Sequence, residues 1–245
     1  MILEIKNLSA EVEKRSVLKG LNLRIGEDEL HVLMGPNGSG KTTLAKVIMG
    51  HPQVRITGGS ITADGKEIND MPVNERAKLG LFLEFQNPVE IEGLGIVNFL
   101  NSARGALNKE KIGYKEFMSE IKQNSDRLKL RDDLLGRSLN YGFSGGEKKK
   151  MEILQMAMLK PKLAILDEPD SGLDIDAVKI VAENINEFRK KNRSSVLLIT
   201  HYSRILNYME PQFIHVMDDG RIGREGGKEL LADIEKTGYG TDDAE

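Results

Sequence analysis

The fold is decided by the stretch Gly35-Pro36-Asn37-Gly38-Ser39-Gly40-Lys41-Thr42. It has the spacing of a phosphate-binding loop: Gly, four residues, then Gly-Lys-Thr. An apolar run from Leu30 to Met34 leads into it, and a helix-compatible run from Thr43 to Met49 leads out, so the sequence predicts strand, loop and helix in the required order. Glycines let backbone N–H groups converge on phosphate oxygens at the positive end of a helix. The stretch therefore predicts a nucleoside triphosphate site rather than a plain turn that happens to hold a lysine.

The side chains of this loop have separate expected tasks. Lys41 should reach the β- and γ-phosphates, and the Thr42 hydroxyl should ligate Mg²⁺. The nucleotide-binding residues expected from the loop are Gly35, Pro36, Asn37, Gly38, Ser39, Gly40, Lys41, Thr42 and Thr43.

A second candidate site element follows the apolar run Leu163 to Leu166, which predicts a buried strand ending in Asp167 and Glu168. A carboxylate at that end of a strand beside the phosphate loop can hold Mg²⁺, which assigns Asp167 to the metal. The next residue, Glu168, is placed to polarise the attacking water as a general base. Taken alone, Asp-Glu-Pro is merely the start of a loop, and the upstream phosphate loop is what favours the catalytic interpretation.

Composition excludes several classes of protein. The 245 residues carry 35 basic and 38 acidic side chains with no dominant basic block, so nothing favours binding to nucleic acid. No apolar run approaches the roughly 20 residues that span a bilayer, and residues 1–4 lack the features of a signal peptide. Cysteine is absent, which excludes disulfides and thiolate metal ligands and favours a cytoplasmic location without direct membrane insertion.

The rest of the chain reads as an α/β body interrupted by helices. Strands are expected at 1–5, 17–25, 81–85, 196–200 and 213–217, a hairpin at 60–69, and a helix at 229–236 before a loose tail at 239–245. From about Ile96 to Leu135 the apolar residues recur with a helical period, which predicts a helical insertion.

Four further motifs resemble those of the ABC ATPase family. Phe143-Ser144-Gly145-Gly146-Glu147 resembles its signature motif, Gln86 its Q-loop, Ser171-Gly172-Leu173-Asp174 its D-loop and His201 its switch histidine, in the family's order and spacing. Each has a plain alternative: Ser144 and Glu147 fit a capping box at a helix start, and Gln86 and His201 are ordinary polar residues after strands. A capped helix that presents amides to phosphate satisfies both interpretations of the signature.

The resemblance implies an α/β fold: an ABC-type P-loop nucleotide-binding domain with a RecA-like α/β core, an antiparallel β portion and a helical subdomain. We expect one domain over residues 1–245, with the catalytic lobe at 1–91 and 151–245 and the helical subdomain at 92–150, ending in the signature.

It also implies ATP and Mg²⁺ as cofactors and the hydrolysis of ATP to ADP and phosphate. Glu168, His201, Gln86 and Lys41 are the implied catalytic residues; the implied metal residues are Thr42, Gln86 and Asp167. Ser144, Gly145 and Gly146 are implied to bind the nucleotide of a second subunit in an ATP-dependent head-to-tail homodimer.

Longer strings resemble the SufC branch of this family, the ATPases of the Suf iron–sulfur cluster assembly system. They run from Phe85 to Ile91, from Phe143 to Met156 and from Leu166 to Asp176, and the ending Gly238-Tyr239-Gly240 is also similar. That resemblance implies SufB- and SufD-like scaffold partners, and we expect these to dock on Asn87 to Gly95 and the helical subdomain. Val89, Ile91, Leu94 and Ile96 are the apolar residues that favour this loop as the docking surface.

The alternatives are the ATP-binding subunit of a membrane ABC transporter and a non-hydrolysing nucleotide switch, which the presence of both Glu168 and His201 disfavours.

Two features depart from the common ABC pattern. Residues 10–14 lack the aromatic residue that usually stacks on adenine, and Val12 offers only an apolar contact, so discrimination between bases should be weak. Three consecutive lysines, 148–150, lie near a helix start, where cations are unfavourable. They form either a solvated face or, through Lys149 or a neighbour, a pair with Glu168 that inhibits the isolated subunit.

Overall fold

The structure is a computed structural model that describes residues 2–107, 113–201 and 203–239. Gly240, which belongs to the expected family-like ending, and the rest of the expected tail to Glu245 lie outside the described residues.

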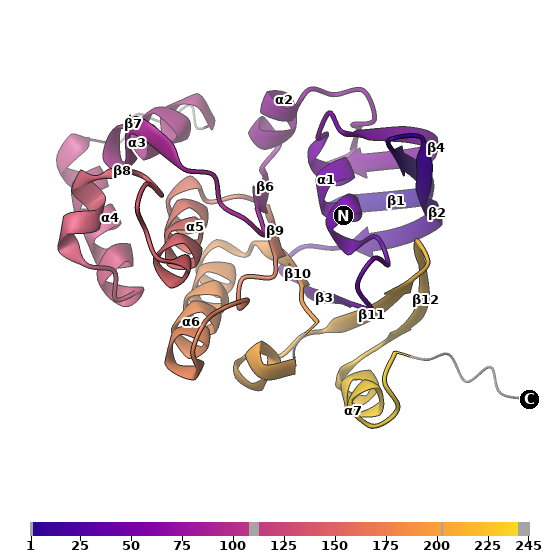
Figure 1. Cartoon of the computed structure of the whole chain (residues 1–245). Coiled ribbons are helices and arrows are strands. Elements are labelled where there is room, and N and C mark those ends of the chain that lie inside the picture. Colours follow the sequence, from indigo (N-terminus) through magenta and orange to yellow (C-terminus); the bar gives the residue numbers. More distant parts are fainter. Residues whose placement is uncertain (1, 108–112, 202, 240–245) are drawn as a thin grey trace, which may run out of the picture.

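A six-stranded sheet runs through the middle of the molecule (Figure 1). Five neighbouring strands are parallel, and the edge strand β12 is antiparallel to β11. In spatial order the strands are β12 (Arg221–Gly226), β11 (Phe213–Asp218), β3 (Leu30–Met34), β10 (Ser195–Ile199), β9 (Leu163–Asp167) and β6 (Leu81–Glu84). The three central strands are buried along their whole length, as expected for parallel strands covered on both faces.

Alternate residues of these strands enter two separate cores. Val32, Leu166 and Leu198 face the helices on one side, whereas Leu33 and Ile165 face α1 (Lys41–Met49) and a second sheet on the other. The second sheet is antiparallel, with strands β2 (Arg15–Ile25), β1 (Leu3–Val12), β4 (Val54–Ala63) and β5 (Lys66–Glu67) in that order. Asp64 and Gly65, both at positive φ, form the turn between β4 and β5, within the hairpin expected at 60–69.

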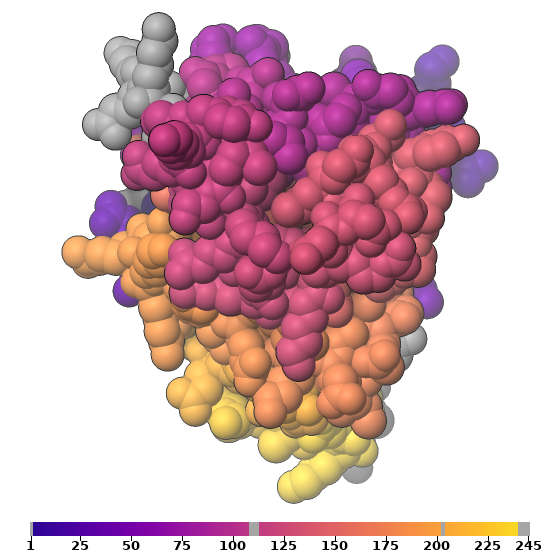
Figure 2. Space-filling view, turned by 90° about the vertical axis from the view of Figure 1, so that its left-hand side faces the viewer, coloured from indigo at the N-terminus to yellow at the C-terminus, as the bar shows by residue number. Residues whose placement is uncertain are grey.

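The helical side is built around α5 (Gly145–Leu159), which is buried on most of its circumference. It packs against the insertion formed by α3 (Ile96–Leu107), α4 (Tyr114–Arg127) and the 3₁₀ turn Asp132–Gly136, and against α6 (Ile175–Asn192). Figure 2 shows this side of the molecule, with the rose surface of the insertion above the orange surface of α6. The insertion buries its apolar stripe, including Phe117, Ile121 and Leu128, in the same core as α5.

The remaining elements are short. Strands β7 (Ile91–Gly95) and β8 (Ser138–Leu139) pair with each other and join the start of the insertion to the segment before the signature. Helix α2 (Val73–Lys78) precedes β6, the 3₁₀ turn Ser203–Tyr208 follows β10, and α7 (Lys228–Thr237) closes the described chain. No helix within the described ranges is long and apolar enough to cross a membrane.

Candidate functional site

The phosphate loop connects the buried strand β3 to α1, as the sequence predicts. Gly35 has φ 145°, and a Cβ atom there would lie 2.0 Å from the carbonyl oxygen of Met217, so no larger residue fits. The Lys41 ammonium bends back over the loop and donates to the carbonyl oxygens of Gly35 and Pro36, both at 2.9 Å. The lysine thus lies in the cradle that a phosphate would occupy.

Lys41 is 7% exposed, and burial lowers the pKa of its ammonium, while the charges of Glu168 and Asp167 oppose that shift. The two carboxylates come from the end of β9, two strands away from β3 in the sheet order. The sheet therefore brings the predicted lysine and the predicted carboxylates into one electrostatic neighbourhood.

Asp167 is the residue best suited to hold a divalent cation. It is 2% exposed, and burial raises the pKa of its carboxyl, while a hydrogen bond with the Thr42 side chain opposes the shift. Its Oδ1 is buried and has no hydrogen-bond partner within the described parts of the chain. A carboxylate and a hydroxyl beside a phosphate cradle suit Mg²⁺, which takes one or two protein oxygens and completes its shell with phosphate and water. Asp167 and Thr42 therefore fit the expected metal.

Glu168 lies between Gln86 and His201, as their predicted places at the ends of adjacent strands imply. The Gln86 amide donates to Oε2 at 2.8 Å, and His201 Nδ1 lies 3.0 Å from Oε1. The backbone of Glu168 adopts φ 57°, which costs of order 1–3 kcal/mol for a non-glycine residue. Its N–H donates to the carbonyl of Ile199 at 2.9 Å, which holds this conformation against the neighbouring strand. Gln86 was also predicted near the metal; here its amide points to Glu168.

The signature forms the predicted capped helix start. Ser144 accepts from the Glu147 N–H at 3.3 Å, and Glu147 Oε2 accepts from the Ser144 N–H at 2.9 Å, which completes a capping box. Within the described ranges, no hydrogen bond joins residues 144–146 to the phosphate loop. The signature and the phosphate loop of one chain are therefore not joined directly in the described structure. Asp174, in the segment that resembles the D-loop, caps α6 by accepting from Ala177 N–H at 2.7 Å.

The predicted pair between Lys149 and Glu168 is wrong. Lys149 Nζ lies 3.3 Å from Glu84 Oε1 and within 3.5 Å of the carbonyl oxygens of Phe85 and Asp167. The lysine enters the interior because α5 packs against β6, where Glu84 is completely buried.

Its neighbour Lys148 pairs with Glu90 at 2.6 Å, not with Glu168. The lysine run is therefore not uniformly solvated, and neither Lys148 nor Lys149 pairs with Glu168.

Two buried groups beside the site were not predicted. Burial raises the pKa of Glu84 to about 8, although the nearby Lys149 opposes the shift. Asp170, also fully buried, accepts from the Thr200 hydroxyl at 3.2 Å, and Arg204 donates to its backbone carbonyl. Asp170 thereby fixes the turn after Glu168. A carboxylate within or just after a buried strand was the available signal for both residues.

The predicted docking loop is only partly apolar on its surface. Val89 and Ile91 are 61% and 42% exposed, whereas Ile96 is completely buried as part of α3. Including Ile96 in the docking surface was therefore wrong. The backbone of this loop is fixed to the signature region, since the Asn140 amide donates to the Val89 carbonyl at 3.0 Å. The loop follows directly after Gln86 in the sequence.

Comparison with known proteins gives consistent results. A family model described as ABC transporter matches residues 18–171. The "Probable ATP-dependent transporter slr0075" of Synechocystis is 51% identical over 242 residues, covering 97% of this chain and 94% of the relative. "Vegetative protein 296" of Bacillus subtilis is 50% identical over 239 residues, covering 97% and 91%. The "Probable ATP-dependent transporter ycf16" of Cyanophora paradoxa is 49% identical over 243 residues, covering 97% and 93%.

Solved structures share the fold. The structure of an ATP-binding subunit of an ABC transporter aligns with a TM-score of 0.80 at 26% identity, covering 98% of this chain and 95% of that one. A dimeric ATP-binding cassette in a post-hydrolysis state, bound to ADP and Pi, also aligns with a TM-score of 0.80, at 21% identity over 92% and 98% of the two chains.

Proposed function

The chain belongs to the ABC transporter family of ATP-binding proteins, and from that premise we propose that it hydrolyses ATP as the motor subunit of a cytoplasmic iron–sulfur cluster assembly scaffold. The proposal of hydrolysis depends on the position of Glu168, which Gln86 and His201 hold at the carboxyl end of the parallel strands. The phosphate loop begins at the same end of the sheet. A carboxylate that is oriented by two side chains and mostly shielded from solvent suits a general base.

Each residue of the site has a separate task in the proposed reaction. When ATP enters, Lys41 leaves the carbonyls of Gly35 and Pro36 and binds the β- and γ-phosphates, while the loop amides cradle the phosphate oxygens. Asp167 and Thr42 would hold Mg²⁺, which neutralises phosphate charge when bound. Glu168 orients a water for in-line attack on the γ-phosphate and takes its proton, and His201 faces the same carboxylate.

In the free subunit, both oxygens of the Glu168 carboxylate lie within hydrogen-bond distance of another side chain. Each oxygen already has one side-chain partner, Gln86 for Oε2 and His201 for Oε1, and the remaining lone pairs are left for a water. Gln86 immediately precedes the loop 87–95, so a protein docked on that loop would shift its amide. We expect slow turnover of the free chain, because hydrogen bonds to a carboxylate make it a weaker base, and faster turnover when a partner moves Gln86.

The scaffold is proposed from the sequence strings that resemble the SufC branch, with SufB- and SufD-like subunits as partners. The exposed Val89 and Ile91 support a docking surface on this loop, because exposed apolar residues that lie together mark contact sites. An apolar groove of about 300 Å³ between α2 and the end of α3, lined by Val73, Phe85 and Leu107, extends that surface.

A head-to-tail homodimer is part of the proposal. Since no described hydrogen bond ties residues 144–146 to their own phosphate loop, we propose that they contact the nucleotide of a second chain. C₂ symmetry then creates two composite sites from two half-sites. We also propose that residues 92–150 form a separate helical subdomain, because the signature at the end of this segment must move as the dimer closes.

The experiment is affinity isolation of the tagged chain, followed by phosphate-release measurements on the isolated complex. We expect soluble partners with the absorption of an iron–sulfur cluster, and crosslinks from a carboxyl-reactive reagent at Glu92, exposed in the docking loop, but not at Glu235, exposed on α7. Integral membrane partners would favour the transporter subunit, the function named for several relatives. Crosslinks at Glu235 alone would contradict the docking surface.

A further inference from the structure

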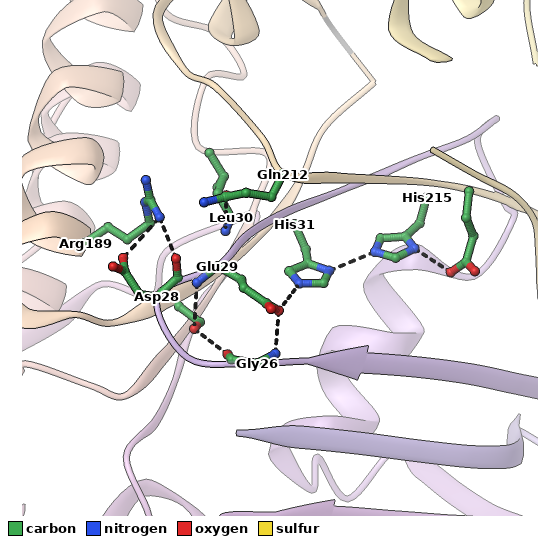
Figure 3. Close-up of polar contacts among 10 residues, drawn as sticks. Gly26, Asp28, Glu29, Leu30, His31, Arg189, Gln212 and His215 are labelled. Carbon is green, nitrogen blue, oxygen red and sulfur yellow. Dashed lines mark hydrogen bonds and ion pairs between the residues drawn. The ribbon is translucent and has the colours of Figure 1, made fainter. Parts of the chain in front are cut away.

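Two histidines lie side by side on the face of the central sheet that is turned toward the antiparallel sheet (Figure 3). His31 belongs to β3 and His215 to the neighbouring β11. Their rings are nearly parallel, with an interplanar angle of 5°, and His31 Nδ1 lies 2.9 Å from His215 Nε2. The side chains are only 2% and 6% exposed, and Phe213 stacks on His31 at 4.6 Å. The pair is far too close and too buried to be two independent surface histidines.

Each ring is held by a carboxylate on its outer nitrogen. His31 Nε2 lies 2.8 Å from Glu29 Oε2, and His215 Nδ1 lies 2.7 Å from Glu225 Oε1. Glu29 is itself fixed, because the same oxygen accepts from the N–H of Gly26 at 2.5 Å. An ionised carboxylate only accepts hydrogen bonds, so each outer ring nitrogen carries the proton of its ring.

The inner nitrogens are then left with lone pairs that point at each other. A neutral imidazole carries one N–H, and that proton is already used on the outer side of each ring. Burial lowers the pKa of both His31 and His215, more than Glu29 and Glu225 raise it, which favours the neutral rings. Two lone pairs at 2.9 Å repel each other unless a cation lies between them.

We propose that His31 Nδ1 and His215 Nε2 bind one divalent transition-metal ion of the class that prefers imidazole, such as Zn²⁺, Fe²⁺, Co²⁺ or Ni²⁺. An outer N–H donated to a carboxylate is the arrangement that orients metal-binding histidines and raises their basicity. At the usual metal–nitrogen distance of about 2.0–2.1 Å, tetrahedral ligands lie roughly 3.3–3.4 Å apart. The two nitrogens would need to separate by about 0.5 Å from their present 2.9 Å, and the rings would need to turn so that both lone pairs converge on one point beside the line between them.

The charges around the histidine pair and its access to solvent both favour a divalent ion. Two positive charges balance the carboxylates of Glu29 and Glu225, whereas a single shared proton leaves one negative charge uncompensated. A cavity of about 830 Å³ borders both histidines and both carboxylates and gives water and ions a route to the pair. Lys6 and Arg24 also line this cavity and share one carboxylate, Glu4, at 2.9 and 3.0 Å, so one of their two positive charges stays unmatched. Both side chains are exposed, at 57% and 67%, and solvent screens that remaining charge from the buried pair.

The site is small. Within the described residues no group of three or more His, Asp or Glu side chains has metal-binding geometry, so the protein supplies the two imidazoles and water completes the shell. Two protein ligands imply moderate affinity. Mg²⁺ would not compete, because it prefers oxygen ligands, and this separates the site from Asp167 and Thr42.

Nuclear magnetic resonance of the imidazoles tests the proposal directly, because the chain has only four histidines. Metal-free protein without nucleotide, in excess Mg²⁺, is titrated with Zn²⁺ while long-range ¹H–¹⁵N spectra report which nitrogens carry protons. We expect protonated Nε2 in His31 and protonated Nδ1 in His215, and saturable shifts at their inner nitrogens at one equivalent, with His51 and His201 unchanged. Zn²⁺-independent spectra with a third proton shared between the two rings would overturn the proposal.

Variants add a second measurement by calorimetric Zn²⁺ titration. His215→Gln should weaken binding at least tenfold, and Glu225→Gln should weaken it by about 10–100-fold through loss of the outer hydrogen bond. The Glu225 side chain is 59% exposed, so this substitution tests the site even if a buried histidine variant does not fold. His51→Gln is the matched control and should bind as the wild type does. Unchanged Zn²⁺ affinity in Glu225→Gln, or in a folded His215→Gln protein, would contradict the assignment.

Discussion

At pH 9, where Glu84 is mostly ionised, replacing Lys149 with methionine should destabilise the protein strongly, because it leaves the buried Glu84 carboxylate without its counter-charge. Both side chains are nearly or fully buried, at 6% and 0% exposure. Removal of one partner of a buried ion pair costs about 3–5 kcal/mol. We expect the lower end, about 3 kcal/mol, because burial already raises the pKa of Glu84 to about 8 and the orphaned carboxyl can take up a proton.

The assay is urea unfolding at pH 9 followed by far-ultraviolet circular dichroism, since the chain has no tryptophan to serve as a fluorescent probe. Lys148→Met is the matched control: its partner Glu90 is 42% exposed, so its loss should stay below about 1 kcal/mol. The double variant Lys149→Met, Glu84→Met should recover most of the stability, because it removes both buried charges. A loss for Lys149→Met no larger than that for Lys148→Met would refute the interpretation of the pair as a buried one.

Three further outcomes follow from the site. Glu168→Gln should retain ATP affinity but lower turnover by about 10²–10⁴-fold, because it removes the base and leaves the phosphate cradle intact; unchanged phosphate release would exclude this base. ATP and GTP should differ in dissociation constant by less than about tenfold, measured by calorimetry, because Val12 cannot stack on a base, and a larger gap would point to another base-reading residue. Glu84 should contribute a fall in the free energy of unfolding as pH rises between about 4.5 and 8. Folded Glu84 keeps its proton up to a pKa of about 8, whereas the unfolded chain releases it near 4.5. Glu84→Gln should flatten this part of the pH profile. If the urea midpoint depended on pH in the same way in the wild type and in Glu84→Gln, the assignment of this titration to Glu84 would be contradicted.

The parts of the fold that depend on local patterns were predictable. Continuous apolar runs identified the central strands, and the glycine spacing identified the loop between β3 and α1. The places of Gln86, Glu168 and His201 also followed from the sequence, because each comes at or just after the carboxyl end of a parallel strand.

Features that depend on tertiary packing were not predictable. Strand β1 was expected only at 1–5 but extends to Val12, because Asn7 at φ 47° and a shift of register after Ile5 break the alternation of apolar residues. The direction of Lys149 depends on how closely α5 packs on β6, which no spacing reveals. The pairing of β7 with β8 joins segments more than forty residues apart and lacks an apolar alternation.

The shared site between two chains is the central claim, and mixing two inactive variants tests it most directly. Lys41→Ala removes the phosphate ligand from one half-site, and Ser144→Arg blocks the signature of the other half. Random pairing of equal amounts gives mixed dimers in which one of the two composite sites is intact, so we predict phosphate release at about a quarter of the wild-type rate. Each variant alone should be nearly inactive while still folded by circular dichroism. A mixture no more active than its separate components, or full activity of either variant alone, would contradict the account.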